Sequence, residues 1–368
     1  MSRNSIFWIG RFVLTGLICI GVAPSQQALA AQQSAEPSVR PSRPAKSTAA
    51  RKTRPKKSSS APAYSASRSR SRQARLAQAR AAARVREMAE AVVPRYKVDA
   101  SGALVPDVRA AAAIIYDPET NQVLWEENSQ APRSIASITK VMTAAVFLES
   151  SPDVAEQITI AKSDVYRAST THLRLNDKVT VDDLLHLLLI ASDNAAARAL
   201  ARISPHGSEG FIDRMNSKAA ELGLESTHYA DPSGLLSDNV SSAYDMARLI
   251  AHASGNDHIA SIMRTSQYTV FAAKRQITFR STNHLLGRED VDVRAGKTGF
   301  ISKAGYCLAT LLRLPQGGQQ VAVVVLGARS NAGRFVETRN LFNWLSNKAS
   351  SIFATATPAT AAAAVPQE

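Results

Sequence analysis

A serine and a lysine stand three residues apart in the segment Ser137-Ile138-Thr139-Lys140. On a helix, positions i and i+3 lie on one face, so the Lys140 amine can reach the Ser137 hydroxyl. A serine hydroxyl is a poor nucleophile until a neighbouring base removes its proton. Lysine serves as that base only if burial or a nearby positive charge brings its pKa far below the free value of about 10.4. The pair therefore predicts covalent catalysis by Ser137, with Lys140 as its base.

A second polar group, Ser192-Asp193-Asn194, lies between two strongly apolar helical stretches. From a turn between helices, Ser192 can relay a proton between Lys140, the nucleophile and the leaving group. Asn194 can hydrogen-bond Lys140 or the backbone of a substrate. The same residue types recur in Ser237-Asp238-Asn239, within a polar loop. We favour the first copy, because a turn between rigid helices holds catalytic geometry better than a loop tip does.

A third motif, Lys297-Thr298-Gly299, enters a predicted strand. It supplies a cation and a hydroxyl that can hold a terminal carboxylate, while Gly299 would let substrate lie against the strand edge. The Lys297 ammonium would also help to lower the pKa of Lys140 by like-charge repulsion. Each motif alone is compatible with a structural role. The occurrence of all three in this order, on helix, turn and strand, favours an active site.

The elements that position these motifs follow from the pattern of apolar residues. A hairpin is predicted over 110–126, with its turn at 117–121. Helical periodicity follows, with Thr180 as an N-cap, in segments 139–150, 181–190, 195–200, 211–222 and 244–253. Strands return from Val291, and a helix over 333–345 closes the folded part. We therefore expect an α+β fold, with an antiparallel five-stranded sheet packed against a helical lobe.

The first thirty residues have the composition of an export signal. Arg3 and Arg11 give a positive start, an apolar stretch follows over 12–22, and Ala28-Leu29-Ala30 offers a small-x-small cleavage pattern. The apolar stretch is shorter than the roughly 20 residues that a membrane span needs. Residues 1–30 are therefore predicted to be a cleaved signal peptide that sends the protein across the inner membrane into the periplasm.

The charge of the chain is concentrated in residues 31–97, which hold 17 Lys or Arg against three Glu. This segment cannot bury enough apolar surface to fold, so we expect a disordered tail with helix-forming composition only over 75–91. In an exported protein such a tail would meet anionic envelope polymers rather than nucleic acid, or act as a solvated spacer. Residues 98–348 are then the catalytic domain, and 349–368 a second disordered tail.

The composition gives no sign of a metal or cofactor site. Signal cleavage would leave Cys307 as the single cysteine, in an apolar alternating run that predicts a buried, inert thiol and no internal disulfide. His, Cys and Asp residues do not cluster with metal-ligand spacing, so we expect neither metal nor cofactor.

The segment from about Ala110 to Leu345 resembles the low-molecular-mass penicillin-binding proteins, which are serine D-Ala-D-Ala peptidases related to serine β-lactamases. Besides the three motifs, the resemblance covers 134–143, 222–224, 231–235 and 282–286. It implies a β-lactamase/DD-peptidase-like fold and acylation of Ser137 by the D-Ala carbonyl of peptidoglycan stem peptides. It also implies an oxyanion hole from the N–H groups of Ser137 and Phe300, deacylation by water, and covalent trapping by β-lactams.

The sequence around the third motif bears on the subclass. The segment 296–308 is similar to the DD-endopeptidase branch, of the penicillin-binding protein 7 type. The DD-carboxypeptidase branch usually adds a β-rich C-terminal domain and an amphipathic anchor, whereas this chain stops after its closing helix. Two departures weaken the subclass: Asp193-Asn194-Ala195 where the branch tends to have Glu-Asn-Arg, and Ser241-Ser242-Ala243 where the family favours Ser-Thr-Ala.

Two other functions remain as alternatives. A serine β-lactamase needs a carboxylate base, typically in a Glu-x-x-Leu-Asn string, and 195–297 contains no such string. Fast hydrolysis of penicillin would favour that alternative. A non-catalytic wall-binding protein would rely on the basic tail, but three intact motifs argue against it.

Overall fold

A computed structural model of the chain describes residues 72–83, 85, 93–272, 275–315 and 318–356. The predictions for the signal peptide, for most of the basic tail and for the chain beyond 356 lie outside these residues. A helix covers 72–83, overlapping the first part of the segment 75–91 whose composition favoured one, and its side chains are exposed. None of the described helices combines the length and hydropathy needed to cross a membrane.

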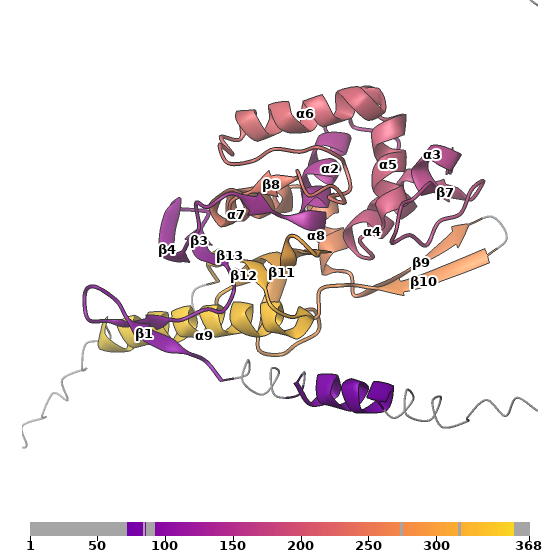
Figure 1. Cartoon of the computed structure of the whole chain (residues 1–368). Coiled ribbons are helices and arrows are strands. Elements are labelled where there is room, and N and C mark those ends of the chain that lie inside the picture. The colour runs from indigo at the N-terminus through magenta and orange to yellow at the C-terminus, as the bar shows by residue number, and fades with distance from the viewer. Residues whose placement is uncertain (1–71, 84, 86–92, 273–274, 316–317, 357–368) are drawn as a thin grey trace, which may run out of the picture. The chain divides into compact units, whose positions relative to one another are not determined.

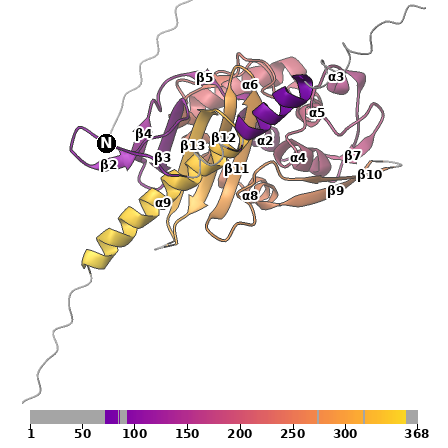
Figure 2. The same cartoon turned by 60° about the horizontal axis from the view of Figure 1, so that its bottom comes forward.

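The expected five-stranded antiparallel sheet is confirmed, in the order β11-β12-β13-β3-β4. Its strands are β3 (Ala112–Asp117), β4 (Gln122–Glu127), β11 (Asp292–Ile301), β12 (Gly305–Arg313) and β13 (Gln320–Ala328). The helical lobe lies above this sheet in Figure 1, and the closing helix α9 (Asn331–Ala356) lies below it. The sheet is thus covered on both faces, as Figure 2 also shows from a second side.

Strand β13 shows why the sequence of the sheet reads as continuous apolar runs. Val321, Val323 and Val325 belong to the core beneath α9, whereas Ala322 and Val324 belong to the core of the helical lobe. A strand that is buried on both faces needs apolar side chains at every position.

The helical lobe contains most of the helices that the sequence predicts. Its members are α2 (Thr139–Leu148), α3 (Lys162–Val165), α4 (Val181–Leu189), α5 (Asn194–Ile203), α6 (Gly207–Glu221), α7 (Ala243–Ser254) and α8 (Asp257–Arg264). The predicted cap at Thr180 is confirmed: its hydroxyl accepts from the Asp183 N–H, and the Asp183 carboxylate accepts from the Thr180 N–H, both at 3.0 Å. The turn between α4 and α5 carries the second motif.

Several short elements were not predicted. They are helices α3 and α8, the hairpin β9 (Gln267–Ala272) and β10 (Arg275–Arg280), and three strand pairs. The pairs are β1 (Tyr96–Val98) with β2 (Leu104–Pro106), β5 (Arg133–Ser134) with β8 (Val240–Ser241), and β6 (Gln157–Thr159) with β7 (Lys178–Thr180). The residues that connect β9 and β10, Ala273 and Lys274, are not those of a typical hairpin turn, which favours Gly, Asn or Asp. Helix α9 continues past its predicted end at Leu345.

Cys307 lies on β12 and is fully buried, as expected for a thiol in an apolar run. Burial raises the pKa of this thiol. A thiol held protonated and away from solvent is a poor nucleophile.

Candidate active site

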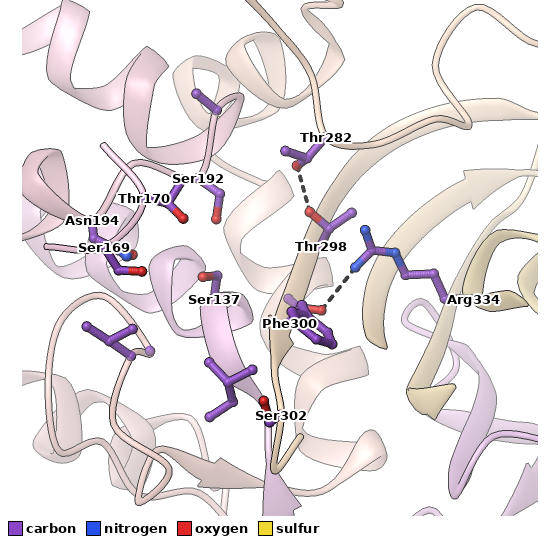
Figure 3. Close-up of a pocket in the computed structure, with 15 residues that line it drawn as sticks. Ser137, Ser169, Thr170, Ser192, Asn194, Thr282, Thr298, Phe300, Ser302 and Arg334 are labelled. Carbon is purple, nitrogen blue, oxygen red and sulfur yellow. Dashed lines mark hydrogen bonds between the residues drawn. The ribbon is translucent and has the colours of Figure 1, made fainter. Parts of the chain in front are cut away.

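The three motifs meet at one cleft of about 500 Å³ between the helical lobe and β11 (Figure 3). Six of the eight predicted site residues line it: Ser137, Ser192, Asn194, Thr298, Gly299 and Phe300. The other two, Lys140 and Lys297, are almost completely buried. Residues from three separate stretches of the chain therefore converge on one cleft.

The Ser137 side chain projects from a single 3-10 turn, Ala136–Ile138, which leads directly into α2. The motif therefore spans the junction of two helix types rather than one α-helix. Ala136 is left-handed, with φ 49°, and its carbonyl accepts from the Thr139 hydroxyl at 2.8 Å. The expected contact still forms, because the Lys140 Nζ lies 3.0 Å from the Ser137 Oγ.

Two glycines press against the backbone of this turn. A Cβ on Gly234 would lie 2.0 Å from the Ala136 carbonyl oxygen, and one on Gly299 would lie 2.6 Å from the Ile135 carbonyl oxygen. We expected Gly299 to make room for substrate at the strand edge. Its missing side chain instead makes room for the turn of the nucleophile, because side-chain positions on a strand project from the face of the sheet.

Lys140 donates three hydrogen bonds from a fully buried amine. The acceptors are the Ser137 Oγ at 3.0 Å, the Asn194 Oδ1 at 2.7 Å and the Ser233 carbonyl at 2.5 Å. Burial lowers the pKa of Lys140 to about 7; the charges of Asp231 and Asp193 oppose this lowering. A large fraction of this amine is therefore neutral near pH 7 and able to accept a proton.

The expected repulsion between the two buried lysines is expressed in the pKa of Lys297. Burial is the largest cause of the lowered Lys140 pKa, and the Arg198 charge adds to it. The pKa of Lys297 is lowered by burial and then by the charges of Lys140 and Arg334. A substrate carboxylate placed beside Lys297 would counter this repulsion and favour the ammonium form.

Ser192 and Asn194 contact different lysines. The Ser192 Oγ accepts from the Lys297 Nζ at 2.8 Å, so the hydroxyl expected to serve Lys140 is bonded to the other lysine. Ser192 has φ 60°, a left-handed conformation that a non-glycine residue adopts at some cost. Asn194 accepts from Lys140 and donates to the Ala168 carbonyl at 2.7 Å. Between them, Asp193 caps α5 by accepting from two backbone N–H groups.

The second copy of the Ser-Asp-Asn motif has a structural role. Asn239 is buried, and its Nδ2 donates to the Asp231 Oδ2 and to the Leu236 carbonyl, both at 2.9 Å. Its Oδ1 accepts from the Ala230 N–H at 3.1 Å. These bonds hold the loop that follows Asp231, and none of residues 237–239 lines the cleft.

Arg334, on α9, is a cleft residue that the sequence did not reveal (Figure 3). Its Nη1 donates to the Gly299 carbonyl at 3.0 Å and to the Cys307 carbonyl at 3.1 Å. Burial lowers its pKa to about 10, so it remains a cation at neutral pH. Locally, Arg334 looks like an ordinary charged residue of a surface helix, because the carbonyls that it meets come from distant strands.

Hydroxyl groups complete the lining. The Thr298 and Thr282 hydroxyls are hydrogen-bonded at 2.6 Å, and Ser169 and Thr170 lie on the opposite wall (Figure 3). Phe300, at the rim, is 49% exposed and stacks on Tyr306. Within the described residues, no group of three or more His, Cys, Asp or Glu is arranged to hold a metal ion.

Comparisons with known proteins show the family to which the chain belongs. A family model described as D-alanyl-D-alanine carboxypeptidase matches residues 97–330. A D-alanyl-D-alanine endopeptidase of Escherichia coli is 33% identical over 250 residues, which cover 67% of this chain and 80% of that protein. One from Pseudomonas aeruginosa is 34% identical over 246 residues, covering 66% and 79%. The solved Streptomyces K15 DD-transpeptidase is 30% identical, with a TM-score of 0.61, over 65% of this chain and 97% of that one.

Proposed function

Because the chain belongs to the D-alanyl-D-alanine carboxypeptidase family of serine peptidases, we propose that it cleaves peptidoglycan stem peptides through an acyl-enzyme on Ser137. Membership in this family and the fold confirm the resemblance to the low-molecular-mass penicillin-binding proteins. The observation that supports the roles of the site residues is the buried Lys140 amine, 3.0 Å from the Ser137 hydroxyl and with a pKa of about 7.

The proposed reaction begins with proton transfer from the Ser137 hydroxyl to the neutral Lys140 amine. The Ser137 Oγ attacks the D-Ala carbonyl, and the backbone N–H groups of Ser137 and Phe300 receive the negative charge that develops on its oxygen. Collapse breaks the peptide bond, and the departing amine takes the proton, with Ser192 and Asn194 ordering the groups around it. Water then releases the acyl group from Ser137.

The cations at one side of the cleft suit a substrate that ends in a carboxylate. Arg334 is a cation at neutral pH, a bound carboxylate would favour the ammonium form of Lys297, and Thr298 provides a hydroxyl. A hydrogen bond to a charged group is worth about 1.5–3 kcal/mol. Lys297→Gln is therefore expected to lower kcat/KM for a D-Ala-D-Ala stem peptide by about 10- to 100-fold.

An amidated stem peptide is the matched control, because it lacks the carboxylate. The wild-type enzyme should cleave it slowly, and Lys297→Gln should cause little further loss. An unchanged kcat/KM for the free-acid peptide in the variant would show that the carboxylate is held elsewhere.

Within the family we propose the endopeptidase activity, with cross-linked stem peptides as substrate. The support is the segment 296–308 together with the two named endopeptidases, about four fifths of whose length this chain covers. Purified muropeptide dimers and monomers separate the alternatives: an endopeptidase converts dimers to monomers. Trimming of pentapeptide monomers with intact dimers would make the protein a carboxypeptidase, and rapid turnover of penicillin would make it a β-lactamase.

We also propose that the enzyme works in the periplasm and that residues 31–97 bind anionic envelope polymers. The support is the sequence: a signal-like start and 17 basic residues against three acidic ones in 31–97. Residues 98–348 would then hydrolyse soluble muropeptides alone. Pelleting with isolated sacculi should fall when the tail is deleted or salt is raised. Equal, salt-insensitive pelleting of both forms would show that the tail is a spacer.

A further inference from the structure

The loop over 231–236, here called the Asp231 loop, is organised by one carboxylate. The Asp231 Oδ1 accepts from the Ser233 N–H and hydroxyl at 2.6 Å each and from the Gly234 N–H at 2.9 Å. Its Oδ2 accepts from the Leu236 N–H at 2.7 Å and from the Asn239 amide at 2.9 Å. Burial acts to raise the pKa of Asp231, but these hydrogen bonds outweigh it and lower that pKa. The loop is therefore folded around an ionised carboxylate.

The Asp231 loop touches the catalytic pair at two points. The Ser233 carbonyl accepts from the Lys140 Nζ at 2.5 Å. The Gly234 Cα lies against the backbone of the Ser137 turn, where an added Cβ would come within 2.9 Å of the Ser137 nitrogen. A third contact ties the loop to α2, because the Thr143 hydroxyl donates to the Pro232 carbonyl at 2.6 Å.

The three groups around the Lys140 amine differ in whether they can donate a hydrogen bond to it. A neutral amine has two N–H bonds and one lone pair. The Ser233 carbonyl can only accept a hydrogen bond, and the Asn194 Oδ1 likewise, whereas the Ser137 hydroxyl can donate one. When Lys140 is neutral, its two N–H groups therefore go to Ser233 and Asn194, and its lone pair is left facing the Ser137 proton.

We infer that Asp231 is a positioning residue for the proposed acylation of Ser137: by holding the Ser233 carbonyl in place, it turns the Lys140 lone pair toward the nucleophile. The inference rests on the proposed function. Asp231 reaches the reacting atoms only through the loop and through its charge. It forms no hydrogen bond with Lys140 among those described.

The charge of Asp231 affects the pKa of Lys140, whereas a residue that only held the loop in place would leave that pKa unchanged. Three charged groups act on Lys140: Asp231 on the loop, Asp193 before α5 and Arg198 on α5. Lys297 on β11 also faces this space, and its own pKa is lowered by the Lys140 charge. Against the lowering by burial, the charges of Asp231 and Asp193 raise the pKa of Lys140. The Ser233 carbonyl also favours the ammonium form by accepting from it. Loss of the Asp231 charge and of a well-placed carbonyl would lower the Lys140 pKa further.

The test is the pH dependence of acylation by a fluorescent penicillin in Asp231→Asn. The plateau rate constant should fall about tenfold, because an amide N–H₂ would face the Leu236 and Asn239 donors and loosen the loop. The acid limb of the profile, which reports protonation of Lys140, should move to lower pH by about one unit. A plateau at the wild-type level overturns the inference, and so does a lower plateau with an unmoved acid limb.

Asp245→Asn is the matched control. Asp245 is also a buried carboxylate that accepts from a backbone N–H and a hydroxyl, those of Ser226 and Thr227. It is not among the charges that act on Lys140. We expect a lower Tm for this variant with an unchanged acylation profile.

Ser233→Ala keeps the inference testable if Asp231→Asn does not fold. It removes one donor to Asp231 and leaves the carbonyl and the charge in the chain. We expect a plateau about threefold lower with an unmoved acid limb; an unchanged plateau counts against the inference. Absence of any acylation of Ser137 in the wild-type protein is a different result, because it removes the proposed function itself.

Discussion

Lys140→Met is expected to lower the second-order rate constant for acylation by penicillin by about 10⁴-fold, the upper range for loss of a general base. The methionine side chain has a similar length and can fill the buried space, but it cannot accept the Ser137 proton. In the described structure, the Lys140 amine is the group that contacts the Ser137 hydroxyl. Time courses of fluorescent-penicillin labelling measure this loss.

The wild-type rate should rise with pH through about 7, where Lys140 passes from ammonium to neutral amine. The sign follows from the role: only the neutral form accepts a proton. Lys303→Met is a suitable control, because Lys303 is an exposed lysine in the turn between β11 and β12. That control should acylate at the wild-type rate. A Lys140→Met rate within tenfold of wild type would assign the base to another group.

Gly234→Ala is expected to reduce acylation by about 10²-fold, the cost of displacing reacting groups by about 1 Å. The new methyl would lie 2.0 Å from the Ala136 carbonyl oxygen and 2.4 Å from its carbon. Both atoms are backbone, so the turn that carries Ser137 must move. The left-handed φ of 75° adds a cost of about 1 kcal/mol.

Gly287→Ala separates the contact from the backbone strain. Gly287 has nearly the same φ, 78°, but an added Cβ would meet nothing within 4 Å. We expect a slightly lower Tm and an unchanged acylation rate. If Gly234→Ala also acylates at the wild-type rate, Gly234 has no part in placing the nucleophile.

The sequence was most informative where a local pattern sets the structure. The pattern of apolar residues predicted the return of strands from Val291, where β11, β12 and β13 lie, and Thr180 as an N-cap predicted the start of α4. The three motifs could be assigned to one site because of their residue types and their order on helix, turn and strand. Their types and order carried enough information to indicate a family that the comparisons confirm.

Two features of the site could not be predicted from the sequence, because they depend on contacts between distant segments of the chain. Arg334 enters the cleft because α9 packs against β12 and β13 and brings the Arg334 guanidinium to the carbonyls of Gly299 and Cys307. The Ser192 hydroxyl is hydrogen-bonded to Lys297 and not to Lys140, which depends on where the two amines lie relative to the turn between α4 and α5. Both relations are distances in three dimensions, and no spacing along the chain encodes them.

The most direct test of the central claim is to locate the acyl group. The protein is incubated with benzylpenicillin, denatured, digested and mapped by mass spectrometry. We expect an adduct with the mass of the intact penicillin, because ring opening transfers every atom, on the peptide that contains Ser137 and on its hydroxyl. Ser137→Ala should carry no adduct while retaining the wild-type Tm. An adduct on another residue, or labelling that persists in Ser137→Ala, would contradict the assignment of Ser137 as the nucleophile.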